Sequence, residues 1–412
     1  MHRASDSGRK SRNGATRPPS CASHPWYRAR GSASNDCGNR AHGRSGKSDR
    51  SGRKGGRSGN GGGNRRKYRL NSHCYSDAFR YNRRMSITAR SAPNIALIKY
   101  WGNRNDTYRL CAANSTSMTL NIPGVRVSVA HADTLVVHSL NKQMTEKDTL
   151  RFAETLRLIR GYLGSLGYDR ALPASLHIEI DSEIPPSIGL ASSSAVFSAL
   201  PKAIAGLLDA DLTDEQISVM ARLGSGSAAR SIFGGFSAIR NTGGNDIDSA
   251  VGWQIVDEHH WQLHDIIIVP STQEKKVGSS EGHAFAQTSP HFAERIRAIK
   301  EYRQQECIDA IEQKDFEKLQ HIAEEDCMDM HRCMETQQPP LHYLSSETLR
   351  IVGEVKQLRE AEHIPVLYTM DAGPTVHLFC TNEARNRIVE FAHEQADCTI
   401  FKASIGPGTH LV

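Results

Sequence analysis

Apolar and polar residues alternate over positions 176–180, and this period of two predicts a β-strand. Positions 196–208 are rich in Ala and Leu, which favours a helix. The central segment between them, 185–195, combines a glycine with three consecutive serines. Glycine lets backbone approach a ligand closely, and the free N–H groups at a helix start bind anions. The pattern predicts a phosphate-binding turn, with an ordinary helix cap as the alternative. The missing Gly-Lys-Ser/Thr ending excludes a Walker loop.

Similar patterns organise the chain after residue 85. Capping boxes at Thr145 and Thr213 predict the starts of two helices. We expect strands over 86–101, 117–120, 125–130 and 134–139, with a polar loop over 103–114. Later we expect strands over 265–269, 365–370, 375–380 and 399–402, and helices over 290–313 (capped by Ser289), 315–334, 346–361 and 382–395. This order predicts an α+β protein of two domains, roughly 85–255 and 256–412.

Residues 1–84 differ from the rest of the chain in charge. They carry 21 Lys or Arg against 4 Asp or Glu, whereas the remainder carries 30 against 41. This extension has almost no apolar runs, so it lacks the material for a core. Nucleic-acid binding is one interpretation of such an Arg/Gly-rich segment, and a transit peptide is another. The sequence favours a third, a disordered extension or upstream sequence translated ahead of a true start at Met85.

Hydropathy and the spacing of the cysteines bear on membrane association and on the cellular location of the protein. No stretch offers the roughly eighteen apolar residues of a membrane span, so we expect no membrane association. The 9 cysteines form no CxxC pair, which indicates free thiols and a cytoplasmic location. Cys327, His331 and Cys333 are metal-ligand types, but on a helix Cys333 would lie about 120° to 160° around from the other two. No metal site is therefore expected there.

Four segments carry the candidate chemistry. They are 94–102 (Asn-Ile-Ala-Leu-Ile-Lys-Tyr-Trp-Gly), the central segment, 224–230 (Gly-Ser-Gly-Ser-Ala-Ala-Arg) and 371–374 (Asp-Ala-Gly-Pro). In this order they resemble the mevalonate diphosphate decarboxylases, a branch of the kinase superfamily that contains galactokinase, homoserine kinase and mevalonate kinase. The resemblance covers residues 85 to about 407. The central segment is common to the superfamily, whereas the other three segments are specific to the decarboxylase branch.

The resemblance implies a reaction and a fold. ATP would phosphorylate the tertiary 3-hydroxyl of mevalonate 5-diphosphate, and loss of phosphate and CO₂ would give isopentenyl diphosphate in the mevalonate pathway of isoprenoid biosynthesis. The N-terminal domain would resemble ribosomal S5 domain 2, and the C-terminal domain a ferredoxin-like α/β sandwich. The active site is expected in the cleft between them. ATP as co-substrate, Mg²⁺ as cofactor and a homodimer are also implied.

The chemistry of the residues agrees with these roles. Asp371, on a tight turn between predicted strands, suits the catalytic carboxylate, either as base or as orienter of the hydroxyl. Lys99 would keep it ionised and screen the transferred phosphoryl group. Arg230 would hold the substrate carboxylate bidentately. The other substrate-binding residues would be Asn94, Tyr100, Ser225, Gly226 and Ser227. The ATP phosphates would be bound by Pro186, Ser187, Gly189, Leu190, Ala191, Ser192, Ser193 and Ser194, with the Ser193 hydroxyl on Mg²⁺.

The chain departs from the family pattern at one point. After Trp-Gly the family usually has a lysine and then Arg-Asp, whereas this chain has Asn-Arg-Asn-Asp at 103–106. A missing cation near the phosphate end leaves two substrates open, the diphosphate and the monophosphate that a phosphomevalonate decarboxylase converts to isopentenyl phosphate. More distant alternatives are a small-molecule kinase without decarboxylation and nucleic-acid binding by residues 1–84.

Overall fold

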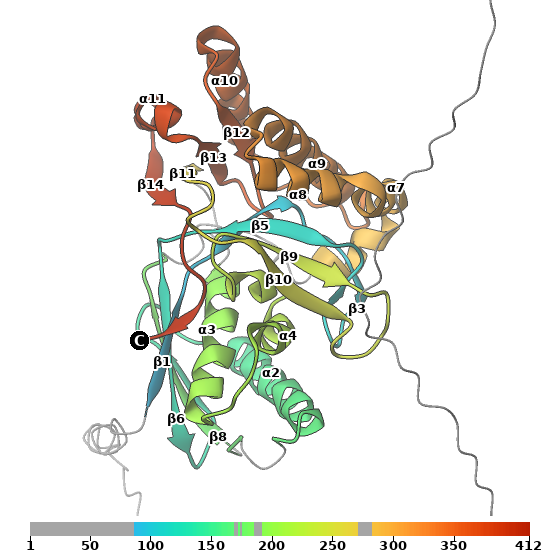
Figure 1. Cartoon of the computed structure of the whole chain (residues 1–412), viewed down its shortest axis with the longest axis vertical. Helices are drawn as coiled ribbons and strands as arrows, with labels where there is room; N and C mark the ends of the chain where they lie inside the picture. The colour runs from blue at the N-terminus through green and yellow to red at the C-terminus, as the bar shows by residue number, and fades with distance from the viewer. Residues whose placement is uncertain (1–85, 169–171, 174, 185–191, 271–281) are drawn as a thin grey trace, which may run out of the picture. The chain divides into compact units, whose positions relative to one another are not determined.

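The structure is a computed structural model, and it describes residues 86–412 except 169–171, 174, 185–191 and 271–281. All of the described residues belong to one compact unit, Leu70–Val412. Sheets of four or five strands and their covering helices build this unit (Figure 1). In the described part of the chain, no helix combines the length and the apolar character that a membrane crossing requires.

The first sheet contains the strand predicted ahead of the central segment. In β8 (Ser175–Ser182), buried side chains alternate with partly exposed ones. The other strands, in the order β15-β1-β6-β8-β7, are β15 (His410–Leu411), β1 (Ile87–Ser91), β6 (Val125–Ala132) and β7 (Val136–Ser139). Helix α3 (Ser192–Leu207) packs across β1 and β6. The predicted strand and helix on either side of the central segment are both confirmed.

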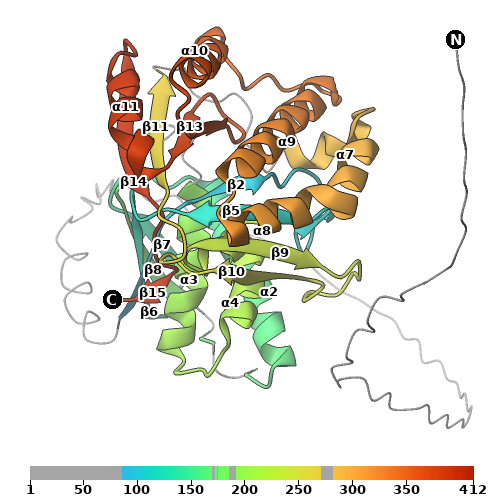
Figure 2. The same ribbon diagram turned by 45° about the horizontal axis from the view of Figure 1, so that its top comes forward.

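The second sheet lies between two layers of helices. Strands β2 (Asn94–Ile98) and β5 (Ser115–Thr119) are buried at every position, because both faces of the sheet are covered. Helices α4 (Asp214–Gly224) and α5 (Ala228–Ser231) contact this sheet. Helices α8 (Gln304–Gln313) and α9 (Phe316–Thr336) contact it from the side opposite α4 (Figure 2). The order β10-β9-β5-β2 is completed by β9 (Phe236–Asn241) and β10 (Ala250–Val256), which the sequence patterns did not predict.

The third sheet brings the Asp371 turn to the second sheet. Its order is β12-β13-β11-β14, with β12 (Val366–Thr369), β13 (Val376–Cys380), β11 (His264–Pro270) and β14 (Cys398–Ser404). Helices α10 (Ser346–Glu362) and α11 (Asn382–His393) pack against this sheet. The Thr369 hydroxyl of β12 donates to the Ala96 carbonyl of β2 at 3.4 Å. Two segments far apart in the sequence are thereby joined directly.

Both predicted capping boxes are present. The Thr145 side chain accepts from Asp148 N at the start of α2 (Glu146–Ser165), and the Thr213 side chain accepts from Gln216 N at the start of α4. In each box the third helical residue returns a hydrogen bond to the backbone of the cap. Reciprocal bonds of this kind satisfy donors that a helix start leaves free.

The helix predicted over 290–313 is confirmed, with one irregularity. It runs as α7 (Phe292–Ala298), a π-helical turn, η3 (Ile299–Arg303), and α8 (Gln304–Gln313), and a 3₁₀ turn, η2 (His283–Thr288), precedes it. The cap position of α7 is His291, whereas the predicted cap, Ser289, lies two residues earlier, where its hydroxyl accepts from His291 N and bonds the Thr336 hydroxyl. The predicted helix 315–334 is confirmed as α9 (Phe316–Thr336) with Asp315 as N-cap.

The segment 103–114 is not a simple polar loop. It contains a short antiparallel pair, β3 (Asn103–Asn105) and β4 (Leu110–Cys111). Leu110 and Cys111 are fully buried against Ala229, Ile239 and Ala250. Two apolar residues in an otherwise polar stretch are enough to anchor it, because they supply a buried contact that the surrounding polar residues lack.

Candidate active site

The ends of β2 and β12 place Lys99 and Asp371 side by side. Lys99 follows β2 directly, and Asp371 lies two residues beyond β12. Lys99 Nζ donates to Asp371 Oδ1 at 2.7 Å. The lysine side chain is 1% exposed and the aspartate side chain 27%, so the carboxylate is the member of the pair that a ligand can reach. The predicted pairing of these two residues is present in the structure.

The electrostatics of this pair keep Asp371 ionised. Burial by itself raises the pKa of Asp371, but Lys99, His377 and Arg230 together outweigh burial and hold that pKa below its usual value. Lys99 acts in two ways, through its charge and through its hydrogen bond to the carboxylate. At neutral pH the site therefore presents a carboxylate that can accept a hydrogen bond or a proton.

Arg230 is built into the same site by polar side chains of two strands. It lies on α5, and its Nε donates to Asn94 Oδ1 at 3.2 Å and to Ser117 Oγ at 2.9 Å. Its Nη1 donates to Ser115 Oγ. The Asn94 amide in turn donates to Ser227 O at 2.9 Å and to the Ser231 hydroxyl. Burial lowers the pKa of Arg230 to about 10, with Asp371 opposing the shift, so the guanidinium stays charged at neutral pH.

The segment 224–230, which we call the small-residue segment, packs closely against Tyr100. A Cβ at Gly226 would lie 2.4 to 2.6 Å from atoms of the Tyr100 ring, so only glycine allows the ring and the backbone to approach this closely. The Ser225 hydroxyl lies 3.2 Å from the Ser193 hydroxyl and 3.5 Å from that of Ser227. The predicted substrate-side serines and the predicted ATP-side serine are thus neighbours.

The predicted ATP-binding residues fall into two groups. Ser192, Ser193 and Ser194 form the first turn of α3, as expected. Ser192 is exposed and Ser193 partly so, whereas Ser194 is fully buried. The remaining five assignments lie outside the described residues, namely Pro186, Ser187, Gly189, Leu190 and Ala191.

A cavity of about 240 Å³ opens beside these serines. Its walls come from β7, β8, α2, α3 and the connection between β7 and α2, and apart from Ser192 and Ser193 the sequence analysis did not identify its lining residues. The lining includes Asn141, Lys142, Met144, Arg151, Phe152, Ser192, Ser193, Val196 and Phe197. The Arg151 guanidinium lies 4.4 Å from the centre of the Phe197 ring, and its Nη2 donates to Gly224 O at 2.8 Å. This contact links the cavity wall to the small-residue segment.

Position 103, where this chain has asparagine in place of the family's usual lysine, lies beside Tyr100 in the candidate site. The Tyr100 hydroxyl donates to Asn103 Oδ1, and Asn103 Nδ2 donates to Asp106 Oδ1 at 2.8 Å. Arg104 does not turn toward Tyr100, because its Nη1 and Nη2 donate to the side chains of Asn245 and Asn241 at 3.0 and 2.9 Å. The Asn103 side chain carries no charge, and both its oxygen and its nitrogen are already hydrogen-bonded within the protein.

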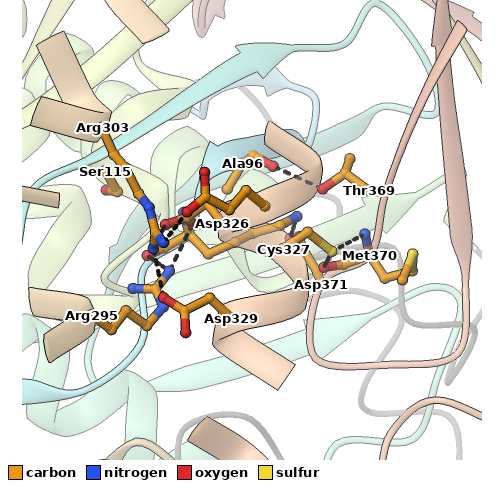
Figure 3. A network of polar contacts seen from close by, with 12 residues as sticks. Ala96, Ser115, Arg295, Arg303, Asp326, Cys327, Asp329, Thr369, Met370 and Asp371 are labelled. Atoms are coloured by element: carbon orange, nitrogen blue, oxygen red, sulfur yellow. Dashed lines mark hydrogen bonds and ion pairs between the residues drawn. The ribbon is translucent and has the colours of Figure 1, made fainter. Parts of the chain in front are cut away.

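Sequence reasoning missed Asp326, Arg295 and Cys327. Asp326 and Cys327 lie on α9, and Figure 3 shows both side chains in the network of polar contacts that also contains Asp371. The one available signal was a carboxylate within the apolar face of a predicted helix. Within the described residues, no group of three or more His, Cys, Asp or Glu side chains is arranged to hold a metal.

Two family models match the chain. The N-terminal domain of diphosphomevalonate decarboxylase-like proteins matches residues 91–251, and the C-terminal domain of mevalonate 5-diphosphate decarboxylase matches residues 265–404. The diphosphomevalonate decarboxylase of Saccharomyces cerevisiae is 32% identical over 324 residues, which cover 75% of this chain and 81% of that protein. The chain belongs to the diphosphomevalonate decarboxylase family.

Solved structures of the family have the same fold. The mevalonate diphosphate decarboxylase of Staphylococcus aureus is 29% identical, with a TM-score of 0.72 over 80% of this chain and 98% of that one. A structure of MDDEF in complex with MVAPP, AMPPCP and magnesium is 30% identical, with a TM-score of 0.71 over 80% of this chain and 99% of that one. The resemblance drawn from the four segments and the α+β fold class are thereby confirmed.

Proposed function

We propose that this chain catalyses the ATP-dependent decarboxylation of mevalonate 5-diphosphate to isopentenyl diphosphate, with release of ADP, phosphate and CO₂. The 2.7 Å ion pair between Lys99 and Asp371 carries the proposal. Phosphoryl transfer depends mainly on positioning and charge, and a carboxylate held ionised beside a buried ammonium supplies both. The membership of the chain in the diphosphomevalonate decarboxylase family supports the substrate.

In this mechanism Asp371 orients the 3-hydroxyl and accepts its proton while the oxygen attacks the terminal phosphoryl group of ATP. Lys99 stabilises the negative charge that develops nearby. The phosphorylated oxygen then leaves C3 as phosphate, the bond between the carboxylate carbon and C2 breaks, and its electron pair forms the new double bond. CO₂ departs with no further reactant.

Arg230 holds the substrate carboxylate before that bond breaks. Its Nε and one N–H of Nη1 are engaged by Asn94, Ser115 and Ser117. The second N–H of Nη1 and the nearer N–H of Nη2 form the end of the guanidinium that remains for a bidentate contact. Tyr100, Ser225 and Ser227 donate to the phosphates of the substrate, and Asn94 and Gly226 fix the shape of that site.

The nucleotide binds on the other side of Ser193. Residues 186, 187 and 189–191, with Ser192 and Ser193, bind the phosphates at the start of α3, and the neighbouring cavity accepts the rest of the nucleotide. The residues fit a magnesium ion that arrives with ATP, because a hydroxyl such as that of Ser193 can join phosphate oxygens and water around it. When bound, Mg²⁺ neutralises phosphate charge.

The monophosphate is the second candidate substrate, and the environment of Asn103 favours it. Asn103 is neutral and bonded to Tyr100 and Asp106, and Arg104 is bonded to two asparagines. The outer phosphate of the diphosphate would therefore meet less positive charge here than a lysine would provide. A phosphomevalonate decarboxylase would make isopentenyl phosphate by the same steps.

The wider setting is also proposed. The chain would have two domains, 85–255 of the ribosomal S5 domain 2-like type and 256–412 of the ferredoxin-like type, with the active site between them. The protein would be a homodimer, and its location would be the cytoplasm. The two family models support the boundary, because their matches meet between residues 251 and 265. Residues 1–84 would be a separate basic extension that takes no part in catalysis.

The test is to incubate the purified protein with ATP, Mg²⁺ and either mevalonate 5-diphosphate or the 5-monophosphate. We expect CO₂ and isopentenyl diphosphate from the first, with a kcat/KM above that for the second. A higher kcat/KM for the monophosphate would identify a phosphomevalonate decarboxylase. ADP release without CO₂ would identify a kinase that only phosphorylates the hydroxyl.

A further inference from the structure

Two adjacent residues of α9 contact the backbone beside both members of the Lys99–Asp371 pair. Asp326 Oδ2 accepts the Lys99 backbone N–H at 2.6 Å. The Cys327 thiol accepts the Met370 N–H at 3.2 Å and lies 3.5 Å from the Met370 carbonyl, to which it donates. Figure 3 shows these contacts converging on one helix. A single rigid element thus holds the ends of β2 and β12, which are also joined by the bond from Thr369 to Ala96 and by the Lys99–Asp371 ion pair itself.

Asp326 is itself fixed from the far side by two buried arginines. Arg295 Nη2 donates to Asp326 Oδ2 at 2.7 Å and to the Lys99 carbonyl at 3.2 Å, and Arg303 lies 3.6 Å from Asp326 Oδ1. In a regular α-helix, residues eight apart lie about 80° apart around the axis, but one extra residue in a π-helical turn reduces this to about 20°. The turn at η3 therefore lets both arginines face one carboxylate.

We infer that α9 acts as a clamp on the active site, in which Asp326, Arg295 and Cys327 are positioning residues that set the separation between Lys99 and Asp371. They touch neither substrate nor ATP in this account, and act through the backbone of the two catalytic residues. The catalytic meaning of the clamp rests on the proposed function, whereas its effect on the geometry of the ion pair does not.

The clamp has a consequence that can be measured without turnover. Lys99 lowers the pKa of Asp371 only while the two side chains stay in contact, because charge and hydrogen bond both weaken with distance. Burial lowers the pKa of His331 to about 4, so this ring is neutral at neutral pH. His377 is bonded to Asp265 at 2.8 Å. The titratable and charged groups that face Asp371 are Lys99, Arg230, His377, His331 and Cys327.

The first experiment compares Cys327→Ala with Cys327→Ser by NMR titration of the Asp371 side-chain carboxyl, assigned with Asp371→Asn. Alanine removes the acceptor of the Met370 N–H, so the turn relaxes away from Lys99. We expect the pKa of Asp371 to rise by about half a unit or more in the alanine variant. Serine keeps a donor and an acceptor and should restore most of the wild-type value. Cys380→Ala is the matched control, because Cys380 is fully buried in the same core cluster as Cys327.

The second readout is catalysis. In Cys327→Ala we expect kcat to fall about tenfold with KM for both substrates within about twofold, because small misplacements of reacting groups reduce turnover. The acid limb of the kcat–pH profile should move to higher pH. Asp326→Asn, which keeps an acceptor but leaves buried Arg295 without the counter-charge of Asp326, should lower kcat further in any preparation that melts as a folded protein.

The outcomes separate the clamp from the reaction. An unchanged Asp371 pKa in both Cys327→Ala and Asp326→Asn, or an equal shift in Cys380→Ala, overturns the clamp even if the wild-type protein is an active decarboxylase. A raised pKa with serine rescue supports the clamp even if the wild-type protein releases no CO₂, and in that case only the proposed function fails.

Discussion

The two sides of the Ser193–Ser225 contact are built differently. On the substrate side, Lys99 and Arg230 are almost fully buried, and both side chains are hydrogen-bonded to protein groups. On the nucleotide side lies an open cavity of about 240 Å³, lined by apolar and polar groups from several elements. In the proposed mechanism the reacting groups are fixed before a ligand arrives, whereas the nucleotide would be accommodated mainly by the shape of the cavity. Changes on the first side should therefore alter kcat, and changes on the second should alter the KM for ATP.

The largest effect is expected from Asp371→Asn. The change keeps the size of the side chain but removes its charge and basicity, and general base catalysis contributes roughly 10² to 10⁴ in rate. We expect turnover to fall about 10³-fold or more while ATP affinity stays nearly constant. Steady-state kinetics combined with nucleotide-binding titrations measure both quantities. Near-normal turnover in this variant is incompatible with the mechanism.

Lys99→Met should reduce turnover somewhat less, by about 10²- to 10³-fold, as for loss of one preorganised charged donor. Without the lysine, burial raises the pKa of Asp371, so the carboxylate takes up its proton at a higher pH than in the wild-type protein. The acid limb of the kcat–pH profile should accordingly move upward. A profile that keeps the wild-type acid limb would show that Lys99 does not set the ionisation of Asp371.

On the nucleotide side, Val196→Phe should raise the KM for ATP about tenfold. Val196 lines the cavity from α3, and a larger ring takes up space that the nucleotide requires. The kcat at saturating ATP and the KM for the mevalonate phosphate should stay within about twofold. Val196→Ala is the control, since it widens the cavity. If the phenylalanine variant lowers kcat instead, the two sides are not as separate as the comparison states.

A smaller effect is expected from Asn103→Lys. A lysine beside a phosphate makes a charge-assisted contact, and the outer phosphate of the diphosphate carries the additional charge that it would meet. We expect the KM for mevalonate 5-diphosphate to fall by about fivefold or more, and the KM for the monophosphate to fall less. Measurements of KM for both substrates with the wild-type protein and with Asn103→Lys test this prediction. An equal change for both substrates would show that position 103 does not distinguish them.

Removal of residues 1–84 should have no effect on either side. These residues lack the apolar content to dock on a folded protein, so a chain that begins at Met85 should keep its melting temperature and both KM values. Thermal unfolding and kinetics on the shortened chain provide the comparison. A loss of activity or solubility in the shortened chain would show that residues 1–84 contribute to the folded, active protein.

The two sides also differ in how far the sequence predicts them. Lys99, Arg230 and Asp371 each lie in a short motif at the end of a predicted strand or helix, so local pattern and residue chemistry indicated their roles. The cavity is lined from β7, β8, α2 and α3, and no local pattern relates Asn141 to Val196. Asp326 was missed for the same reason, because only the packing of α9 on β2 brings it to Lys99.

The fold shows the same limit. Capping boxes and alternating strands were predicted correctly because their determinants lie within a few residues. Strands β9 and β10 were missed because both are flanked by glycines and polar residues, and their identity as strands comes from tertiary pairing, of β9 with β5 and of β10 with β9. The π-helical turn before α8 was missed because the sequence pattern predicts one regular helix there, and the contacts that accompany the turn, those of Arg295 and Arg303 with Asp326, are tertiary.

The most direct test of the central claim is the stoichiometry of products from mevalonate 5-diphosphate and ATP. In a single incubation, ADP, phosphate and CO₂ are each quantified as the reaction proceeds. The account predicts that the three appear in equal amounts with the wild-type protein and that all three are lost together in Asp371→Asn. ADP without CO₂, or CO₂ release that survives in Asp371→Asn, would contradict a reaction in which phosphorylation at the Lys99–Asp371 pair leads to decarboxylation.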